Sequence, residues 1–109
     1  IDNVKTYQNY LYVVNLKKNI SNIEDIRGEN GMIFQVNLKN IHSLSEFVKK
    51  KCQTITYFGV QKSDFRTLIK KNSLLGADRI VEIGKAFDFD LNWDGFDIIR
   101  TLTRVVNIN

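Results

Sequence analysis

The sequence predicts a small α/β protein in which strands and amphipathic helices alternate along the chain. Segments rich in β-branched and aromatic residues recur through it, as is typical of strands, and several stretches between them space their apolar residues as a helix does. The chain has 109 residues, no proline and no linker-like or repeated stretch, so we expect one domain. Short crossovers between strands favour parallel neighbours in a covered sheet.

The first half of the chain is predicted to contain two strands and one helix. Residues 9–15 are β-branched and aromatic, residues 17–30 are polar and end in a turn-forming cluster, and residues 32–38 alternate with period two, which predicts strand, loop and strand. Residues 43–46 read Ser-Leu-Ser-Glu, a capping box that begins a helix. The apolar side of this short amphipathic helix is expected to carry Leu44, Phe47, Val48 and Cys52.

A third strand and a second helix follow. Residues 53–60 have the β-branched and aromatic content of a strand. Ser63 with Asp64 is predicted to begin the helix and Gly76 to end it. The helix is expected to turn Phe65, Leu68 and Ile69 inward and Arg66, Lys70 and Lys71 outward.

The last third is predicted to hold two more strands around a short helix. Residues 79–84 alternate as a fourth strand, and residues 85–93 form a loop. Asp94 or Asp97 is positioned to cap a helical stretch over residues 98–102. Residues 104–109 close as a fifth strand, and because nothing follows it in this sequence, it needs a partner strand in this chain or in another subunit.

Composition excludes several classes of protein. One cysteine cannot form an internal disulfide, so a disulfide-stapled secreted scaffold is excluded and a reducing cytoplasm is expected. The longest uncharged apolar runs, such as residues 10–14, are far too short to span a bilayer. The net charge of +4 is scattered and compatible with phosphate-bearing partners. The chain begins with Ile1 rather than Met, so we expect a piece of a longer protein.

Cys52 and His42 are the residues with the most obvious chemistry. A catalytic cysteine would need a base or a helix N-terminus to form thiolate, whereas Cys52 is predicted at a helix C-terminus, on an apolar stripe. We therefore interpret it as a core cysteine. A metal site would require further ligands, but His42 has no second His or Cys nearby, so we interpret it as a solvated loop residue.

The remaining motifs give weaker signals. Four aspartates, Asp88, Asp90, Asp94 and Asp97, could form an acid–base pair or a cation site, but their spacing is not that of a calcium loop. We interpret Asp94 and Asp97 as helix caps. The sequence contains neither a Walker loop nor a Gly-x-Gly-x-x-Gly motif.

A small basic RNA-binding module is an alternative. Tyr57, Phe58, Phe87 and Phe89 could stack on bases. Asp88 and Asp90, however, place negative charge where phosphate would run. We therefore expect no nucleic acid. A purely structural domain that joins subunits through its last strand is a third interpretation.

Three segments, in order, resemble the C-terminal end of the LuxC-type acyl-CoA reductases, a branch of the aldehyde dehydrogenase superfamily. Residues 52–59, Cys-Gln-Thr-Ile-Thr-Tyr-Phe-Gly, are similar to the family's Gln-Thr strand. Residues 75–84 are similar to its Gly-x-x-Arg segment with a closing glycine. Trp93-Asp94-Gly95 with residues 99–104 is similar to its Trp-Asp-Gly turn and its Leu-x-Arg close. The match spans residues 31–109, and residues 1–30 match less clearly.

The resemblance implies a fold and a place in a larger enzyme. Residues 31–103 would form the C-terminal part of an aldehyde-dehydrogenase-like catalytic domain, built from strand-helix units. Residues 104–109 would form a terminal strand of the kind used for subunit pairing, which implies a homo-oligomer. The cofactor domain and the nucleophilic cysteine would lie upstream. Cys52 adjoins the Gln-Thr strand and is therefore expected to be structural, so no catalytic residue is assigned to this chain.

The resemblance also implies an activity. The family reduces long-chain fatty acyl thioesters, presented as acyl-CoA or acyl-enzyme, to fatty aldehydes with NADPH through an acyl-cysteine intermediate. In luminous bacteria the aldehyde feeds luciferase, and the reductase works in the cytoplasm with acyltransferase and acyl-protein synthetase subunits, without membrane insertion. The chain alone is expected to be inactive. Gln53, Thr54, Trp93 and Asp94 are motif residues without a derived role, and Gly95 most simply serves a tight turn.

Overall fold

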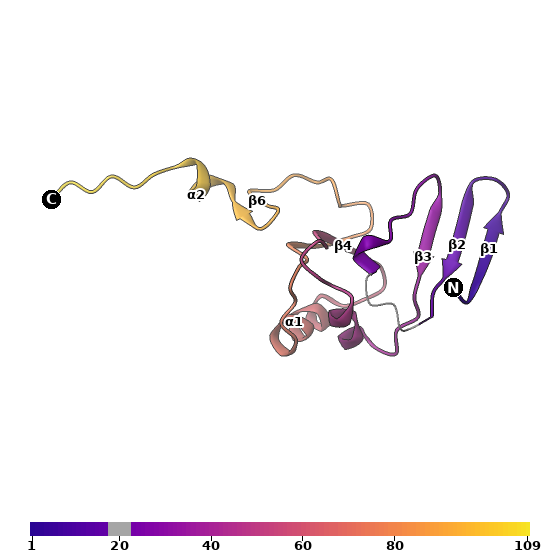
Figure 1. Ribbon diagram of the computed structural model, residues 1–109. Coiled ribbons are helices and arrows are strands. Elements are labelled where there is room, and N and C mark those ends of the chain that lie inside the picture. Colours follow the sequence, from indigo (N-terminus) through magenta and orange to yellow (C-terminus); the bar gives the residue numbers. More distant parts are fainter. Residues whose placement is uncertain (18–22) are drawn as a thin grey trace. The chain divides into compact units, whose positions relative to one another are not determined.

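The computed structural model describes residues 1–17 and 23–109 (Figure 1). The chain divides into two compact units, Ile1–Phe47 and Val48–Asn109, which are treated separately below. Helices and short strands occur in both, so the protein is a small mixed α/β structure, as the sequence predicts. Its division into a catalytic part at 31–103 and a terminal strand stays a prediction.

A three-stranded sheet organises the first unit. β1 (Asn3–Tyr7) pairs antiparallel with β2 (Leu11–Asn15), and β3 (Met32–Gln35) pairs parallel with β2 on its other side. The strands expected at 9–15 and 32–38 are thus confirmed with shorter bounds. β1 was not predicted. Its five residues are all exposed, so the strand has no buried face that would show as an apolar period in the sequence.

The helix expected after residues 43–46 is replaced by a 3-10 helix. η2 spans Ile41–Glu46 and begins at Asn40, whose side chain accepts a hydrogen bond from the Ser43 backbone N–H at 3.2 Å. The predicted Ser43 capping box is therefore wrong. The Ser45 hydroxyl donates to the His42 carbonyl at 2.8 Å, which competes with the bonding of an α-helix at that carbonyl. A second 3-10 turn, η1 (Ile23–Asp25), lies in the predicted polar stretch.

The second unit is built on a strand-helix-strand motif. β4 (Thr54–Tyr57) and β5 (Arg79–Glu82) are parallel, with Tyr57 opposite Glu82, and α1 (Lys62–Lys71) connects them. This confirms two strands, one helix and the parallel crossover. Buried side chains of this unit are Val48, Phe65 and Leu68, so the core lies under the inner face of α1.

The ends of α1 differ from the prediction. The helix begins at Lys62, with Gln61 as its N-cap, and not at Ser63. It ends at Lys71, where Asn72 caps it, so Gly76 is not its stop signal. Gly76 instead packs so closely against the Lys49 and Cys52 carbonyl oxygens that a Cβ would collide with them. Ile69, expected to face inward, is largely exposed.

The chain then forms a short hairpin and a short helix. β6 (Asn92–Trp93) and β7 (Phe96–Asp97) are antiparallel, and the turn between them has positive φ at Asp94 and Gly95. α2 (Ile98–Leu102) begins at Asp97, whose carboxylate accepts from the Arg100 backbone N–H at 3.0 Å. Of the two aspartates interpreted as helix caps, Asp97 is confirmed, whereas Asp94 lies in the turn between β6 and β7 and caps no helix.

Two predictions about the sheets are wrong. Residues 103–109 have no regular secondary structure, so the fifth strand at 104–109 is not formed. A strand needs a neighbour for its backbone N–H and C=O groups, and within the described chain none pairs with this segment. The described strands also form three small sheets in place of one covered sheet.

Candidate functional site

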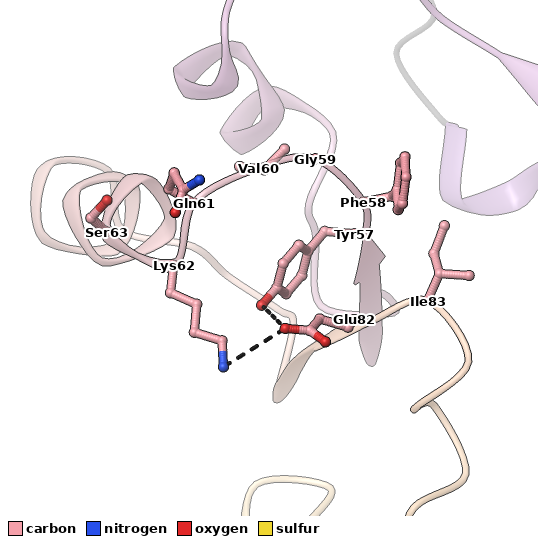
Figure 2. A pocket seen from close by; sticks show the side chains of 9 residues that line it. All are labelled: Tyr57, Phe58, Gly59, Val60, Gln61, Lys62, Ser63, Glu82 and Ile83. Carbon is pink, nitrogen blue, oxygen red and sulfur yellow. Dashed lines mark hydrogen bonds and ion pairs between the residues drawn. The ribbon is translucent and has the colours of Figure 1, made fainter.

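A pocket of about 740 Å³ lies at the carboxyl ends of β4 and β5, beside the beginning of α1. Ligands of open parallel α/β sheets bind outside the carboxyl ends of the strands, and this volume falls in the range of small-molecule sites. The lining residues come from two stretches of the chain, residues 57–63 and residues 82–83 (Figure 2). They are Tyr57, Phe58, Gly59, Val60, Gln61, Lys62, Ser63, Glu82 and Ile83. We call this cavity the strand-end pocket.

One wall of the strand-end pocket is polar. Glu82 accepts a hydrogen bond from the Tyr57 hydroxyl at 3.5 Å, and its carboxylate lies 3.9 Å from the Lys62 ammonium (Figure 2). Tyr57 and Glu82 face each other because they are register partners in β4 and β5. Lys62 and Glu82 are both mostly exposed, so this ion pair orients the side chains and adds little stability.

The other wall is apolar. Phe58 follows β4 and Ile83 follows β5, and the two side chains lie next to each other on the side away from Lys62 (Figure 2). The Ile83 N–H donates to the Tyr57 carbonyl at 3.0 Å, which extends the parallel pairing by one step. Phe58 and Ile83 are 86% and 65% exposed. Exposed apolar side chains gathered at a cavity are typical of a contact surface.

Each strand ends in the same pattern of an apolar residue followed by glycine. Gly59 has φ +70° and Gly84 has φ +90°, a conformation that glycine adopts without strain. These two turns carry the chain away from the sheet immediately after Phe58 and Ile83. The space beside both glycines is open, since an added Cβ at either would meet nothing within 4 Å.

Arg79 fixes the loop that follows β5. Its guanidinium donates to the Ala86 carbonyl at 2.6 Å and to the Asp88 carbonyl at 2.8 Å. The same group lies 4.3 Å from the centroid of the Trp93 ring, and Trp93 stacks on Phe89 at 5.3 Å. Arginine alone combines a planar donor fork with stacking on an aromatic face. We call Arg79, Trp93 and Phe89 with the two carbonyls the Arg79 cluster.

Residues 52–59, residues 75–84 and the turn at Trp93–Gly95 contact one another. Residues 52–59 and 75–84 contain β4 and β5, which pair directly, and the Ala77 N–H donates to the Cys52 carbonyl at 2.6 Å. Trp93 lies against Arg79, and a Cβ on Gly95 would approach the Asp78 carboxylate to 3.0 Å. Gly95 has φ +79°, which agrees with the tight turn expected of it.

Cys52 and His42 lie outside the strand-end pocket. Cys52 is half-buried, and its backbone accepts from Ala77 and donates to the Lys49 carbonyl at 2.9 Å. Its predicted place at the C-terminus of an amphipathic helix is wrong, because η2 ends at Glu46 and Cys52 lies just before β4. Its structural role stays a prediction. His42 is half-buried and lies in η2 of the first unit. The predicted solvated loop position is therefore wrong, because His42 is neither fully exposed nor in a loop.

The aspartates between residues 88 and 97 have local roles. Asp88 pairs with Lys85 at 3.1 Å, Asp90 accepts from the Leu91 N–H at 2.6 Å, and Asp97 caps α2. Across residues 1–17 and 23–109, no three His, Cys, Asp or Glu side chains are grouped so that they could hold a metal ion.

The aromatic residues considered for base stacking are not assembled on one platform. Tyr57 packs against Phe65 with ring centroids 4.9 Å apart, and Phe89 stacks on Trp93. Phe58 belongs to the strand-end pocket, and Phe87 is 95% exposed in the loop after β5. Two of the four rings thus have intramolecular partners.

The chain's own residues do not fit NADPH. A dinucleotide cradle uses three glycines at a strand-to-helix turn, whereas the turn from β4 into α1 contains Gly59 alone. Lys62, at the start of α1, is directed to Glu82. No step involving the cofactor is therefore derived from this chain.

Comparisons of the chain with protein-family models, curated proteins and solved structures found no match. Among the described residues, neither α1 nor α2 has the length and apolar character that crossing a bilayer requires. Sequence reasoning singled out Tyr57, Phe58 and Gly59 but not Lys62, Glu82 or Ile83. The repeated apolar-Gly pair at the two strand ends is the signal that could have found this set.

Proposed function

We propose that this chain is the C-terminal segment of an NADPH-dependent long-chain acyl-CoA reductase of the LuxC type. The enzyme would reduce a fatty acyl thioester to the aldehyde used by a bacterial luciferase, in the cytoplasm and together with acyltransferase and acyl-protein synthetase subunits. The segment would complete the catalytic domain, and the acylated cysteine and the cofactor site would lie upstream.

The contacts among the three resembling segments carry this proposal. Residues 52–59 and 75–84 form adjacent parallel strands, and Trp93 and Gly95 pack on Arg79 and Asp78. Segments that are separate in the sequence are thus spatial neighbours, and Gly95 at its close approach to Asp78 and Arg79 on Trp93 have physical reasons for being present. A chance likeness in three separate stretches would not require such contacts.

The large exposed apolar surface supports the same proposal. Side chains of the second unit that are more than half exposed include Phe58, Ile83, Leu91, Phe96, Leu102, Val105 and Ile108. An apolar surface of this extent is typical of a face that packs against another part of a protein. A segment that completes a larger catalytic domain would have such a face.

The proposed reaction is balanced as acyl thioester, NADPH and a proton giving aldehyde, free thiol and NADP⁺. An enzyme cysteine would make the reduction easier by dividing it into acyl transfer and hydride delivery. The contribution of this chain would be structural and positional: β4, α1 and β5 present the strand-end pocket, and the Arg79 cluster holds the following loop.

The test uses the complete polypeptide whose C-terminal part is this chain. We expect NADPH oxidation that depends on tetradecanoyl-CoA, with formation of tetradecanal detected by mass spectrometry. Cys52→Ala is the matched variant, and we expect it to retain most of the activity, since the proposal assigns Cys52 no catalytic role. A complete polypeptide that folds, binds NADPH and yields no aldehyde would exclude the proposal, and salt-dependent RNA binding would favour the alternative of a basic RNA-binding module.

A further inference from the structure

β1 lies at the edge of the three-stranded sheet, and its outer side has no partner strand among residues 1–17 and 23–109 (Figure 1). All five of its residues are exposed. A strand with an unpaired edge can form hydrogen bonds to a strand of another chain. This edge belongs to the first unit, and its pairing is independent of the function proposed above.

The hydrogen bonds of β2 show which backbone groups of β1 are free. The Tyr12 N–H donates at 2.9 Å to the carbonyl of the residue before β3. Since the backbone groups of successive strand residues point to opposite edges, Val13 turns toward β1, where Lys5 is its register partner. Lys5 therefore points its N–H and C=O at β2. Val4 and Thr6, on either side of Lys5, point theirs away from the sheet, where they can bond to another strand.

Val4 is the outermost member of an apolar row that crosses the sheet. Val4, Val14 and Phe34 are register partners in the three strands, so their side chains lie on one face. Val14 is 5% exposed, whereas Val4 at the edge is 50% exposed. A fourth strand with an apolar residue opposite Val4 would continue this row and cover part of the Val4 side chain.

We propose that β1 pairs antiparallel with β1 of a second copy of this chain, about a twofold axis at Val4. The two Val4 residues exchange a pair of backbone hydrogen bonds, and Asn3 of each copy lies opposite Lys5 of the other. Because both copies present the same edge, the interface is isologous. The two three-stranded sheets join into one sheet, and the apolar row runs without interruption from Phe34 of one copy to Phe34 of the other.

The charges near the axis select this register. Antiparallel pairing centred on Lys5 would set two ammonium groups directly opposite each other, which is destabilising. Pairing centred on Asn3 would set Val4 opposite the Asp2 carboxylate. Pairing centred on Thr6 would bring the turn after β1 opposite Val4. With Val4 at the axis, Lys5 faces an uncharged amide and valine faces valine, so β1 is complementary to itself in this register.

A charge reversal at the axis tests the pairing. In the complete polypeptide, Val4→Lys and Val4→Glu each place two like charges opposite each other and remove the valine contact. We expect dimerisation, measured by sedimentation velocity, to weaken at least about tenfold in each variant. An equimolar mixture of the two is expected to restore it, because opposite charges then face each other.

Ile33→Lys is the matched control for the charge variants. Ile33 is 52% exposed and lies in β3, away from the edge formed by β1, so we expect it to leave dimerisation unchanged. Circular dichroism is expected to show no change in folding in any of the three variants, since each replaces a half-exposed side chain.

Cross-linking tests the register. Facing residues of a hydrogen-bonded antiparallel pair have Cα atoms about 5.5 Å apart, a distance that a disulfide spans. Val4→Cys is therefore expected to form a disulfide between two copies on mild oxidation, identified by mass spectrometry, and Lys5→Cys to form little. A wild-type polypeptide that stays monomeric, a dimer that Val4→Lys does not weaken, a mixture that does not restore association, or more cross-linking in Lys5→Cys would each overturn the proposal.

Discussion

The motif formed by β4, α1 and β5 and the segment formed by residues 98–109 use apolar residues very differently. In the first, Phe65 and Leu68 are buried, and Leu68 has no exposed surface at all. The second has as many apolar residues for its length, yet Leu102, Val105 and Ile108 are among the most exposed side chains of the protein. Both belong to the same compact unit.

The difference shows that apolar content buries surface only where a second element returns to cover it. The crossover through α1 brings a helix face onto two paired strands, and burial follows. Residues 103–109 follow α2 and pair with none of the described strands. Their apolar side chains therefore stay exposed to water. Such a segment presents an exposed apolar surface without regular secondary structure.

The largest expected effect tests the buried side of this comparison. Leu68→Ala removes a fully buried side chain and leaves a cavity, so we expect the free energy of unfolding to fall by about 3 kcal/mol. Ile69→Ala, on the exposed face of the same helix, is expected to cost less than about 1 kcal/mol. Urea unfolding followed by circular dichroism of the complete polypeptide measures both. Equal losses would show that the two faces of α1 are not distinguished by burial.

An intermediate effect is expected in the loop between the two regions. Arg79→Ala removes two hydrogen bonds to carbonyls and the contact with Trp93, at a cost of about 2 kcal/mol. Arg79→Lys is expected to recover little of it, because an ammonium cannot reproduce the planar fork. Faster amide hydrogen exchange over residues 85–93, with a changed Trp93 fluorescence, is the expected readout. Arg66→Ala on the exposed face of α1 is the control, and a similar change there would argue against a specific role for Arg79.

The smallest effect on stability is expected in the exposed segment. Val105→Ser with Ile108→Ser changes side chains that are almost fully exposed, so the free energy of unfolding should change by less than about 0.5 kcal/mol. Self-association, measured by sedimentation velocity, is instead expected to weaken because the apolar contact surface is smaller. A large loss of stability without a change in self-association would show that the segment packs within its own chain.

Local patterns predicted the elements whose stability is local or whose partners are close in sequence. The strand content of residues 53–60 and 79–84, the inward Phe65 and Leu68, and the cap at Asp97 all follow from propensity, periodicity and capping chemistry. Asn40 is the N-cap in place of Ser43, since its side chain accepts from the Ser43 backbone N–H and the helical turn begins three residues earlier. β1 was missed because an exposed strand has no apolar face to reveal it.

The sequence by itself determined the α/β class, the parallel crossover and the amphipathic face of α1. The tertiary structure decided which residues meet. Lys62, Glu82 and Ile83 join Phe58 only because the register sets Tyr57 opposite Glu82, and Arg79 reaches Trp93 only because the loop after β5 folds back. Local conformation depends on near neighbours in the chain, whereas register and long-range contacts depend on the packing of elements that no single stretch of sequence encodes.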